Sequence, residues 1–213
     1  MFFSKDQLLE MYKNAADVIR YPADNGISKD NYPYVEADQN TLNGFVDALL
    51  NKGYLSDKKS QSICDVGFGL GTSLYNINLQ IKFNSVIKNK FYFTAIEYNE
   101  KLVELFNQFL KYKWENINVD ISEKDIEVIA DDLFNLDFSK YDVVYMYSPL
   151  KEPSLVYEGY KHIYSSMKQG AVLYERYNRG CGVHNILDKF IDDNNLKTDL
   201  LYFGDGINKI LIK

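Results

Sequence analysis

The chain has 213 residues, of which 46% are hydrophobic and 25% charged, with a formal net charge of −6 and a pI near 5.0. This length is enough for one well-buried domain and excludes two full-sized ones, and the composition is that of an ordinary globular protein. The acidic balance argues against a duplex nucleic-acid partner, which usually selects a basic face.

Two cysteines, Cys64 and Cys181, cannot form a disulfide framework or a zinc site by themselves, so no metal is expected. Cys64 lies in an apolar run that predicts a buried strand. No apolar stretch has the length of a secretory signal or of a membrane span. We therefore expect a cytoplasmic protein that does not enter a membrane.

The first 60 residues predict two helices, Ser4 to Ile19 and Gln39 to Leu50, joined by a polar segment with Pro and Tyr. We expect this N-terminal extension, 1–60, to belong to the same domain as the rest and to form part of a lid.

From Gln61 onward, strand-like and helix-like segments alternate, which indicates a parallel sheet with helices on both faces. Expected strands are Ile63 to Val66, Phe91 to Glu97, Ile126 to Ala130, Tyr141 to Tyr147, Gly170 to Glu175, Thr198 to Phe203 and Ile207 to Ile212. Expected helices are Thr72 to Phe83, Asn99 to Tyr112, Ser154 to Met167 and Val183 to Asn194.

The last two strands are separated only by Gly204-Asp205-Gly206, so they form an antiparallel hairpin. The predicted fold class is α/β: residues 61–213 form a three-layer, doubly wound sheet of seven strands. The sheet is mostly parallel, with an antiparallel last strand.

The run Asp65-Val66-Gly67-Phe68-Gly69-Leu70-Gly71 follows the first of these strands directly. Glycines at every second position can adopt positive φ and place no Cβ between the chain and a ligand. The helix that follows offers unpaired N–H groups at the same place. This pattern predicts a polar ligand lying against backbone at the carboxyl end of a strand.

Two known phosphate-binding patterns resemble this run only in part. A dinucleotide fingerprint requires G-x-G-x-x-G, and Thr72 stands where its third glycine would be. A phosphate loop requires Gly-Lys-Ser/Thr, which is absent. An NAD-dependent oxidoreductase is therefore the second choice.

Several segments, in order, resemble the class I S-adenosylmethionine-dependent methyltransferases. The glycine run looks like that family's first motif, Glu97 ends the second strand where the family places an acid, and the terminal hairpin matches its reversed last strand. The other matching segments are Ile126 to Leu133, Tyr141 to Tyr147 and Met167 to Leu173.

The resemblance implies S-adenosylmethionine as the cofactor and assigns its contacts. Gly67, Phe68, Gly69 and Gly71 would lie along its methionine and ribose, and Asp65 would order the turn by accepting backbone N–H bonds. The Glu97 carboxylate would accept both ribose hydroxyls, and charge-assisted bonds are the strong kind. Asp132 would accept the adenine amino group, and the Leu133 N–H would donate to a ring nitrogen of the base. The Tyr98 ring would stack on adenine, and Tyr147 would contact the methionine part of the cofactor.

Two alternatives to these contacts stay open. Tyr98 is as readily explained as one of the 18 tyrosines that lies on the surface. Asp131 would replace Asp132 if the register differed by one residue, although Asp132 is preferred because Leu136 then falls where the family has an apolar residue.

The methyl acceptor is less well specified. Tyr147-Ser148-Pro149-Leu150-Lys151 resembles the Ser/Asn/Asp-Pro-Pro-Tyr/Phe signature of amino methyltransferases, but Leu150 and Lys151 depart from it. A small-molecule acceptor is favoured over a macromolecule, with Tyr147, Ser148 and Glu175 as candidate catalytic residues. The remaining alternative is a non-catalytic protein that binds S-adenosylmethionine and acts as a regulatory partner.

Overall fold

A single sheet of seven strands forms the centre of the structure, in the order β3-β2-β1-β4-β5-β7-β6. The computed structural model describes residues 39–56, 59–69, 71–83, 90–100, 102–104, 106–107, 126–147, 149–176, 185–203 and 206–213. The strands are β1 (Gln61–Val66), β2 (Phe91–Glu97), β3 (Ile126–Ala130), β4 (Val143–Tyr147), β5 (Val172–Arg176), β6 (Thr198–Phe203) and β7 (Gly206–Ile212).

Strands β1 to β5 are parallel, whereas β7 is antiparallel to both β5 and β6. The predicted α/β fold with a reversed strand in a terminal hairpin is therefore confirmed. Four strands have boundaries that differ from the sequence prediction: β1 begins at Gln61, β4 begins at Val143, β5 runs from Val172 to Arg176, and β7 begins at Gly206.

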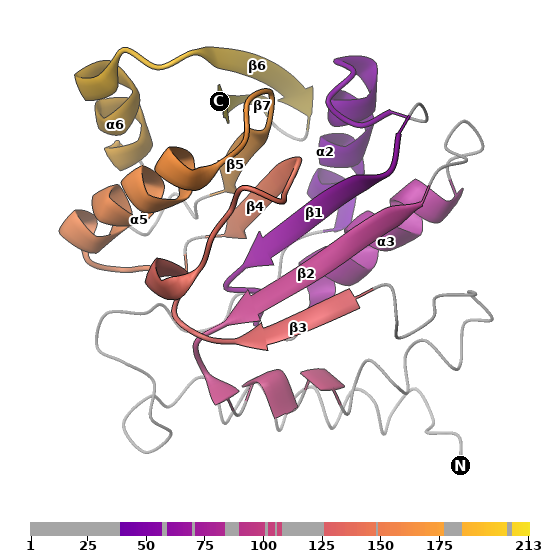
Figure 1. Cartoon of the computed structure of the whole chain (residues 1–213). Coiled ribbons are helices and arrows are strands. Elements are labelled where there is room, and N and C mark those ends of the chain that lie inside the picture. The colour runs from indigo at the N-terminus through magenta and orange to yellow at the C-terminus, as the bar shows by residue number, and fades with distance from the viewer. Residues whose placement is uncertain are drawn as a thin grey trace.

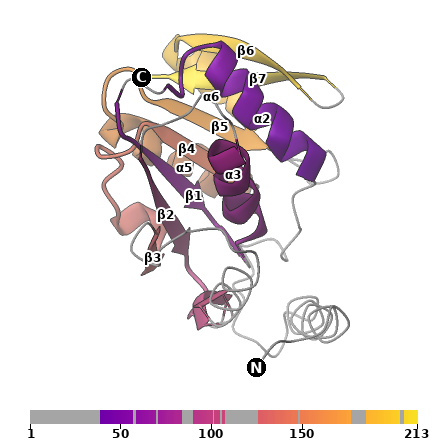
Figure 2. The same ribbon diagram turned by 90° about the vertical axis from the view of Figure 1, so that its right-hand side faces the viewer.

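Helices cover both faces of the sheet (Figure 1). Helices α2 (Gln39–Asn51) and α3 (Thr72–Phe83) lie on one face, and α5 (Pro153–Ser166) and α6 (Ile186–Asn194) on the other. Figure 2 views the molecule from the side of α2 and α3. Each layer has its own core: Phe45, Leu74, Tyr145 and Tyr174 belong to the first, and Met146, Tyr160, Leu173 and Phe190 to the second. Because both faces are covered, the central strands are nearly continuously buried.

Helix α2 is part of this layered core. Its buried residues Leu42, Phe45, Val46 and Leu49 recur at the spacing of one helical face, and the ring of Phe45 stacks on Tyr174 of β5 at 4.7 Å between centroids. Just beyond the helix, Lys52 binds Asp199 of β6 at 2.9 Å. The first predicted helix, Ser4 to Ile19, lies outside the described residues, so the lid remains a prediction.

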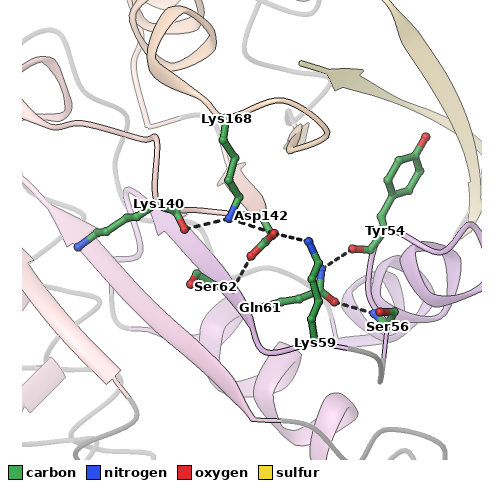
Figure 3. A network of polar contacts seen from close by, with 8 residues as sticks. All are labelled: Tyr54, Ser56, Lys59, Gln61, Ser62, Lys140, Asp142 and Lys168. Atoms are coloured by element: carbon green, nitrogen blue, oxygen red, sulfur yellow. Dashed lines mark hydrogen bonds and ion pairs between the residues drawn. The ribbon is translucent and has the colours of Figure 1, made fainter.

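A network of polar contacts ties together the amino-terminal edge of the sheet (Figure 3). Asp142, just before β4, accepts the Ser62 N–H of β1 at 2.9 Å and the ammonium of Lys168 at 3.0 Å. Burial alone would raise the pKa of Asp142, but the Ser62 N–H and the ammonium groups of Lys168 and Lys59 hold it below its ordinary value. These contacts hold β1 and the start of β4 together, and the opposite, carboxyl-terminal edge carries the predicted site.

Strand order reverses between β1 and β4, because β2 and β3 lie on one side of β1 and β5 on the other. In doubly wound sheets such a reversal opens a crevice at the carboxyl ends of the strands, where ligands bind. Within the described part of the chain, the helices are all too short or too polar to span a lipid bilayer.

Candidate functional site

The glycine turn after β1 lies at this reversal point. Gly67, Gly69 and Gly71 have φ of 71°, 57° and 75°, the left-handed conformation that the sequence predicts. A Cβ on Gly67 would lie 2.5 Å from Pro149 Cβ, and one on Gly71 would lie 1.9 Å from Phe106 Cε2. The close approach of Pro149 and Phe106 therefore requires glycine at these two positions, whether or not a ligand binds there.

Most N–H groups of the turn are bonded within the protein. Gly67 and Phe68 both donate to the Ile96 carbonyl, at 2.8 and 3.2 Å, and Gly71 donates to the Phe68 carbonyl at 2.8 Å. The Phe68 ring is buried and lies 4.5 Å from the Phe106 ring. Contact of this turn with a cofactor remains a prediction, and any such contact would involve surfaces other than these N–H groups.

Glu97, the last residue of β2, holds the turn from the neighbouring strand. One carboxylate oxygen accepts the Gly69 N–H at 3.1 Å, and the other accepts the Asn99 N–H at 3.0 Å. Burial raises the pKa of Glu97 above its ordinary value, although the N–H groups of Asn99, Gly69 and Tyr98 lower it. A carboxylate has about four acceptor sites, and these N–H groups do not fill all of them, so Glu97 can still accept from a ribose hydroxyl.

Asp65 lies directly beneath the turn and is 1% exposed. Its carboxyl accepts the N–H of Leu74 in the first turn of α3, while its Oδ2 has no hydrogen-bond partner. Burial and the nearby Glu97 carboxylate raise the pKa of Asp65 to about 8. A buried carboxyl with an orphaned oxygen and a like-charged neighbour is suited to a cationic partner.

The predicted adenine side follows β3. Asp132 caps the 3₁₀ turn η2 (Leu133–Asn135) by accepting the Phe134 N–H at 3.1 Å. The Asp131 carboxylate accepts the backbone N–H of Asp132 at 2.7 Å and the side-chain amide N–H of Asn135 at 2.8 Å. Leu133 is the first residue of this turn, a position whose N–H has no partner inside a helix.

Tyr98 follows Glu97 and is 55% exposed, so its ring has the accessible surface that the predicted stacking on adenine requires.

The predicted acceptor side is formed by the ends of β4 and β5. Tyr147 pairs with Arg176 across the two strands, and the guanidinium lies 5.1 Å from the centre of the Tyr147 ring. Glu175 is one residue earlier and 4% exposed. Ser148 lies outside the described residues, as does Cys181.

Parallel pairing brings these residues to one edge. Val66 pairs with Ile96 of β2 and with Met146 of β4, and Met146 pairs with Glu175 of β5. On the other side, Glu97 pairs with Ala130, one residue before Asp131. The acids predicted from sequence therefore lie at or near the ends of neighbouring strands. The residues that hold the turn could not be predicted from the sequence; they are Pro149, Phe106 and the backbone carbonyl of Ile96.

No family model and no curated protein sequence matches this chain. Among solved structures, it is similar to precorrin-6y C5,15-methyltransferase from Geobacter metallireducens, with a TM-score of 0.57, 12% identity, and coverage of 89% of this chain and 95% of that one. It is also similar to a proposed S-adenosylmethionine-dependent methyltransferase from Methanococcus maripaludis (TM-score 0.53, 14% identity, 100% and 94% covered) and to the O-methyltransferase NovP (0.52, 8%, 97% and 97%). At these identities the similarity shows the fold, which is the Rossmann-like fold of class I methyltransferases.

Proposed function

We propose that this chain binds S-adenosylmethionine at the carboxyl edge of the sheet and transfers its methyl group to a small-molecule acceptor. The observation that carries the proposal is the pair of carboxyls at the glycine turn: Asp65 is buried and its Oδ2 has no hydrogen-bond partner, and half-buried Glu97 accepts the Gly69 N–H. The fold similarity to methyltransferases supports the same reading.

The residues present fit the chemistry of this cofactor. S-adenosylmethionine supplies an electrophilic methyl group on a positively charged sulfur, next to an ammonium group, and it carries no phosphate. A cation beside Asp65 would give the orphaned Oδ2 a partner and favour the ionised carboxylate.

The same geometry disfavours a dinucleotide. Phosphate-binding turns cradle the anion with free backbone N–H groups, but here Gly67 and Phe68 donate to the Ile96 carbonyl and Gly69 donates to Glu97. An NAD-dependent reaction is therefore the weaker interpretation.

On the nucleoside side, we assign the two ribose hydroxyls to the Glu97 carboxylate. The Asp132 carboxylate would accept the adenine amino group, with the Leu133 N–H on a ring nitrogen and the Tyr98 ring against the base. Glu97 and Asp132 each hold backbone N–H groups through hydrogen bonds, so both carboxylates are fixed in orientation before a ligand arrives.

On the acceptor side, an in-line displacement mainly requires that the nucleophile is held on the far side of the methyl carbon from the sulfur. Tyr147, Ser148 and Glu175 are the residues assigned to this task. The contact of Arg176 with the Tyr147 ring fixes that ring at the end of β4.

The proposal is tested by thermal unfolding with S-adenosylhomocysteine, the demethylated product, and with NAD. A ligand at 100 times its dissociation constant stabilises the folded state by about 2.7 kcal/mol, which raises the Tm of a domain of this size by roughly 5–10 °C. NAD at the same concentration should leave the Tm unchanged. Equal stabilisation by NAD would overturn the proposal.

Two variants refine this test. Glu97→Ala should lose most of the Tm increase given by S-adenosylhomocysteine. Glu158→Ala is the matched control, because Glu158 is exposed on α5 and pairs only with Lys161 among the described residues.

A further inference from the structure

The turn η2, which carries the residues assigned to adenine, is held by helix α5. Asp132 caps the start of this turn and Leu136 its end, where the Leu136 N–H donates to the Leu133 carbonyl at 3.3 Å. The Leu136 carbonyl in turn lies 2.8 Å from Nε2 of His162 on α5. Because a carbonyl oxygen only accepts, Nε2 carries the proton and donates, whether the imidazole is neutral or charged. This hydrogen bond joins α5 to the end of the turn.

Two phenylalanines hold the half-buried His162 ring in place. Its centroid lies 5.8 Å from that of Phe134, a residue of the turn, and 6.0 Å from that of Phe138, which it meets edge-on. Phe138 is buried, and its backbone N–H donates at 3.2 Å to the hydroxyl of Ser166, one turn further along α5. The imidazole is therefore packed from two sides, which restricts the direction of its N–H to that of a single carbonyl.

The turn also packs on α5 through apolar atoms. Leu133 is buried, and a Cβ on Gly159 of α5 would lie 3.9 Å from its Cδ1. Apolar packing is non-directional, so it brings the turn to the helix without setting how the turn is rotated. A hydrogen bond weakens steeply when its angle departs from linear. The bond from His162 therefore adds the directional control that the contact at Gly159 lacks.

Resting on the proposed function, we propose that His162 is a positioning residue for adenine recognition. It acts through the Leu136 carbonyl and sets the orientation in which the turn presents the Asp132 carboxylate and the Leu133 N–H to the edge of the base. Both groups lie within the same short turn as Leu136, so a displacement of one end of the turn moves the other. Hydrogen bonds to the base depend on distance and angle, so a rotated turn loses them.

The test compares S-adenosylhomocysteine with S-inosylhomocysteine, which carries hypoxanthine in place of adenine. Deamination replaces the amino donor by a carbonyl oxygen and turns the neighbouring ring nitrogen into a donor. Both base contacts assigned to the turn are therefore lost in the inosine compound, while its ribose and amino-acid parts are unchanged. Isothermal titration should show about ten- to a hundred-fold tighter binding of S-adenosylhomocysteine by the unmodified chain.

Two substitutions separate the N–H donor of His162 from its packing. His162→Phe keeps an aromatic ring beside Phe134 and Phe138 but has no donor for the Leu136 carbonyl, so it should lower the preference for adenine by about three- to ten-fold. His162→Gln carries an amide N–H at a similar reach, so it should restore most of the preference. If His162→Phe does not fold, His162→Met takes its place, because a flexible side chain fills the same space without a donor.

Tyr164→Phe is the matched control. Tyr164 lies on the same helix, and its hydroxyl donates to the Ile212 carbonyl of β7 at 3.2 Å. This variant therefore also removes one hydrogen bond from α5 to a backbone carbonyl while keeping an aromatic ring, and its preference for adenine should equal that of the unmodified chain. In an Asp132→Ala background, His162→Phe should change the preference little further, because the two residues act through the same turn.

The outcomes separate this inference from the proposed function. If S-adenosylhomocysteine is preferred but the donor-free variant loses no more preference than Tyr164→Phe, the role of His162 is refuted and the cofactor assignment stands. The same conclusion follows if His162→Gln loses as much preference as the donor-free variant. An unmodified chain that binds both compounds equally overturns the inference while still supporting the cofactor. If neither compound binds, the proposed function fails and this inference fails with it.

Discussion

Replacing Gly71 by alanine tests whether the glycine turn has the packing described above. Gly71 has a φ of 75°, and an added Cβ would lie 1.9 Å from Cε2 and 2.3 Å from Cδ2 of Phe106. The left-handed backbone costs a non-glycine residue about 1–2 kcal/mol. Phe106 is 1% exposed and packs in the core beside α2 and α3, and overpacking in a core costs about a further 1–3 kcal/mol.

Gly170→Ala is the control that separates these two costs. Gly170 has a φ of 81°, but a Cβ there meets no atom within 4 Å. We therefore expect Gly170→Ala to lower the free energy of unfolding by about 1–2 kcal/mol and Gly71→Ala by about 2–5 kcal/mol. Urea titrations followed by circular dichroism give both values, provided that the m-value is unchanged.

A second substitution shows whether Phe106 is the cause. In the Gly71→Ala background, Phe106→Leu should cost less than it does in the unmodified chain, because the smaller side chain relieves the contact. Equal destabilisation by Gly71→Ala and Gly170→Ala, with additive effects of Phe106→Leu, would refute the proposed packing of the turn.

Three further predictions concern the acids. Glu97→Ala should weaken S-adenosylhomocysteine binding by about 1–3 kcal/mol; unchanged affinity in a calorimetric titration would mean that Glu97 does not hold the ribose. Asp132→Asn should retain more binding than Asp132→Ala, since the amide oxygen can still accept the Phe134 N–H, and the reverse order would remove Asp132 from the site. For Asp65, the folded-state pKa of about 8 lies above its ordinary value of 3.8, so its contribution to stability is full below about pH 4 and is lost as the pH rises through 8. Urea midpoints at pH 5 and pH 8 should therefore differ less in Asp65→Asn than in the unmodified chain, and an equal difference would contradict the shifted pKa.

Much of the fold could be predicted from the sequence because the signals are local. Alternating apolar runs and helical periodicity located β2, β3, α3 and β6 at the bounds that the structure shows. The glycine spacing predicted the positive φ values, and the hairpin followed from a separation too short for any other connection. Cys64 is buried in β1, as its apolar surroundings indicated.

The reasons for the glycines could not be predicted, because they depend on contacts between distant segments. Pro149 lies 82 positions after Gly67, and no local pattern relates the two. The second role of Glu97 was hidden for the same reason: its bond to the Gly69 N–H joins residues 28 positions apart. The burial of Glu175 likewise follows from packing on the sheet and not from its immediate neighbours.

A crystal structure with S-adenosylhomocysteine bound tests the central claim most directly. We predict that both ribose hydroxyls lie within hydrogen-bond distance of the Glu97 carboxylate, with adenine beside Asp132 and Leu133 and the sulfur facing the ends of β4 and β5. A nucleoside bound elsewhere on the sheet, or with its ribose away from Glu97, would contradict it.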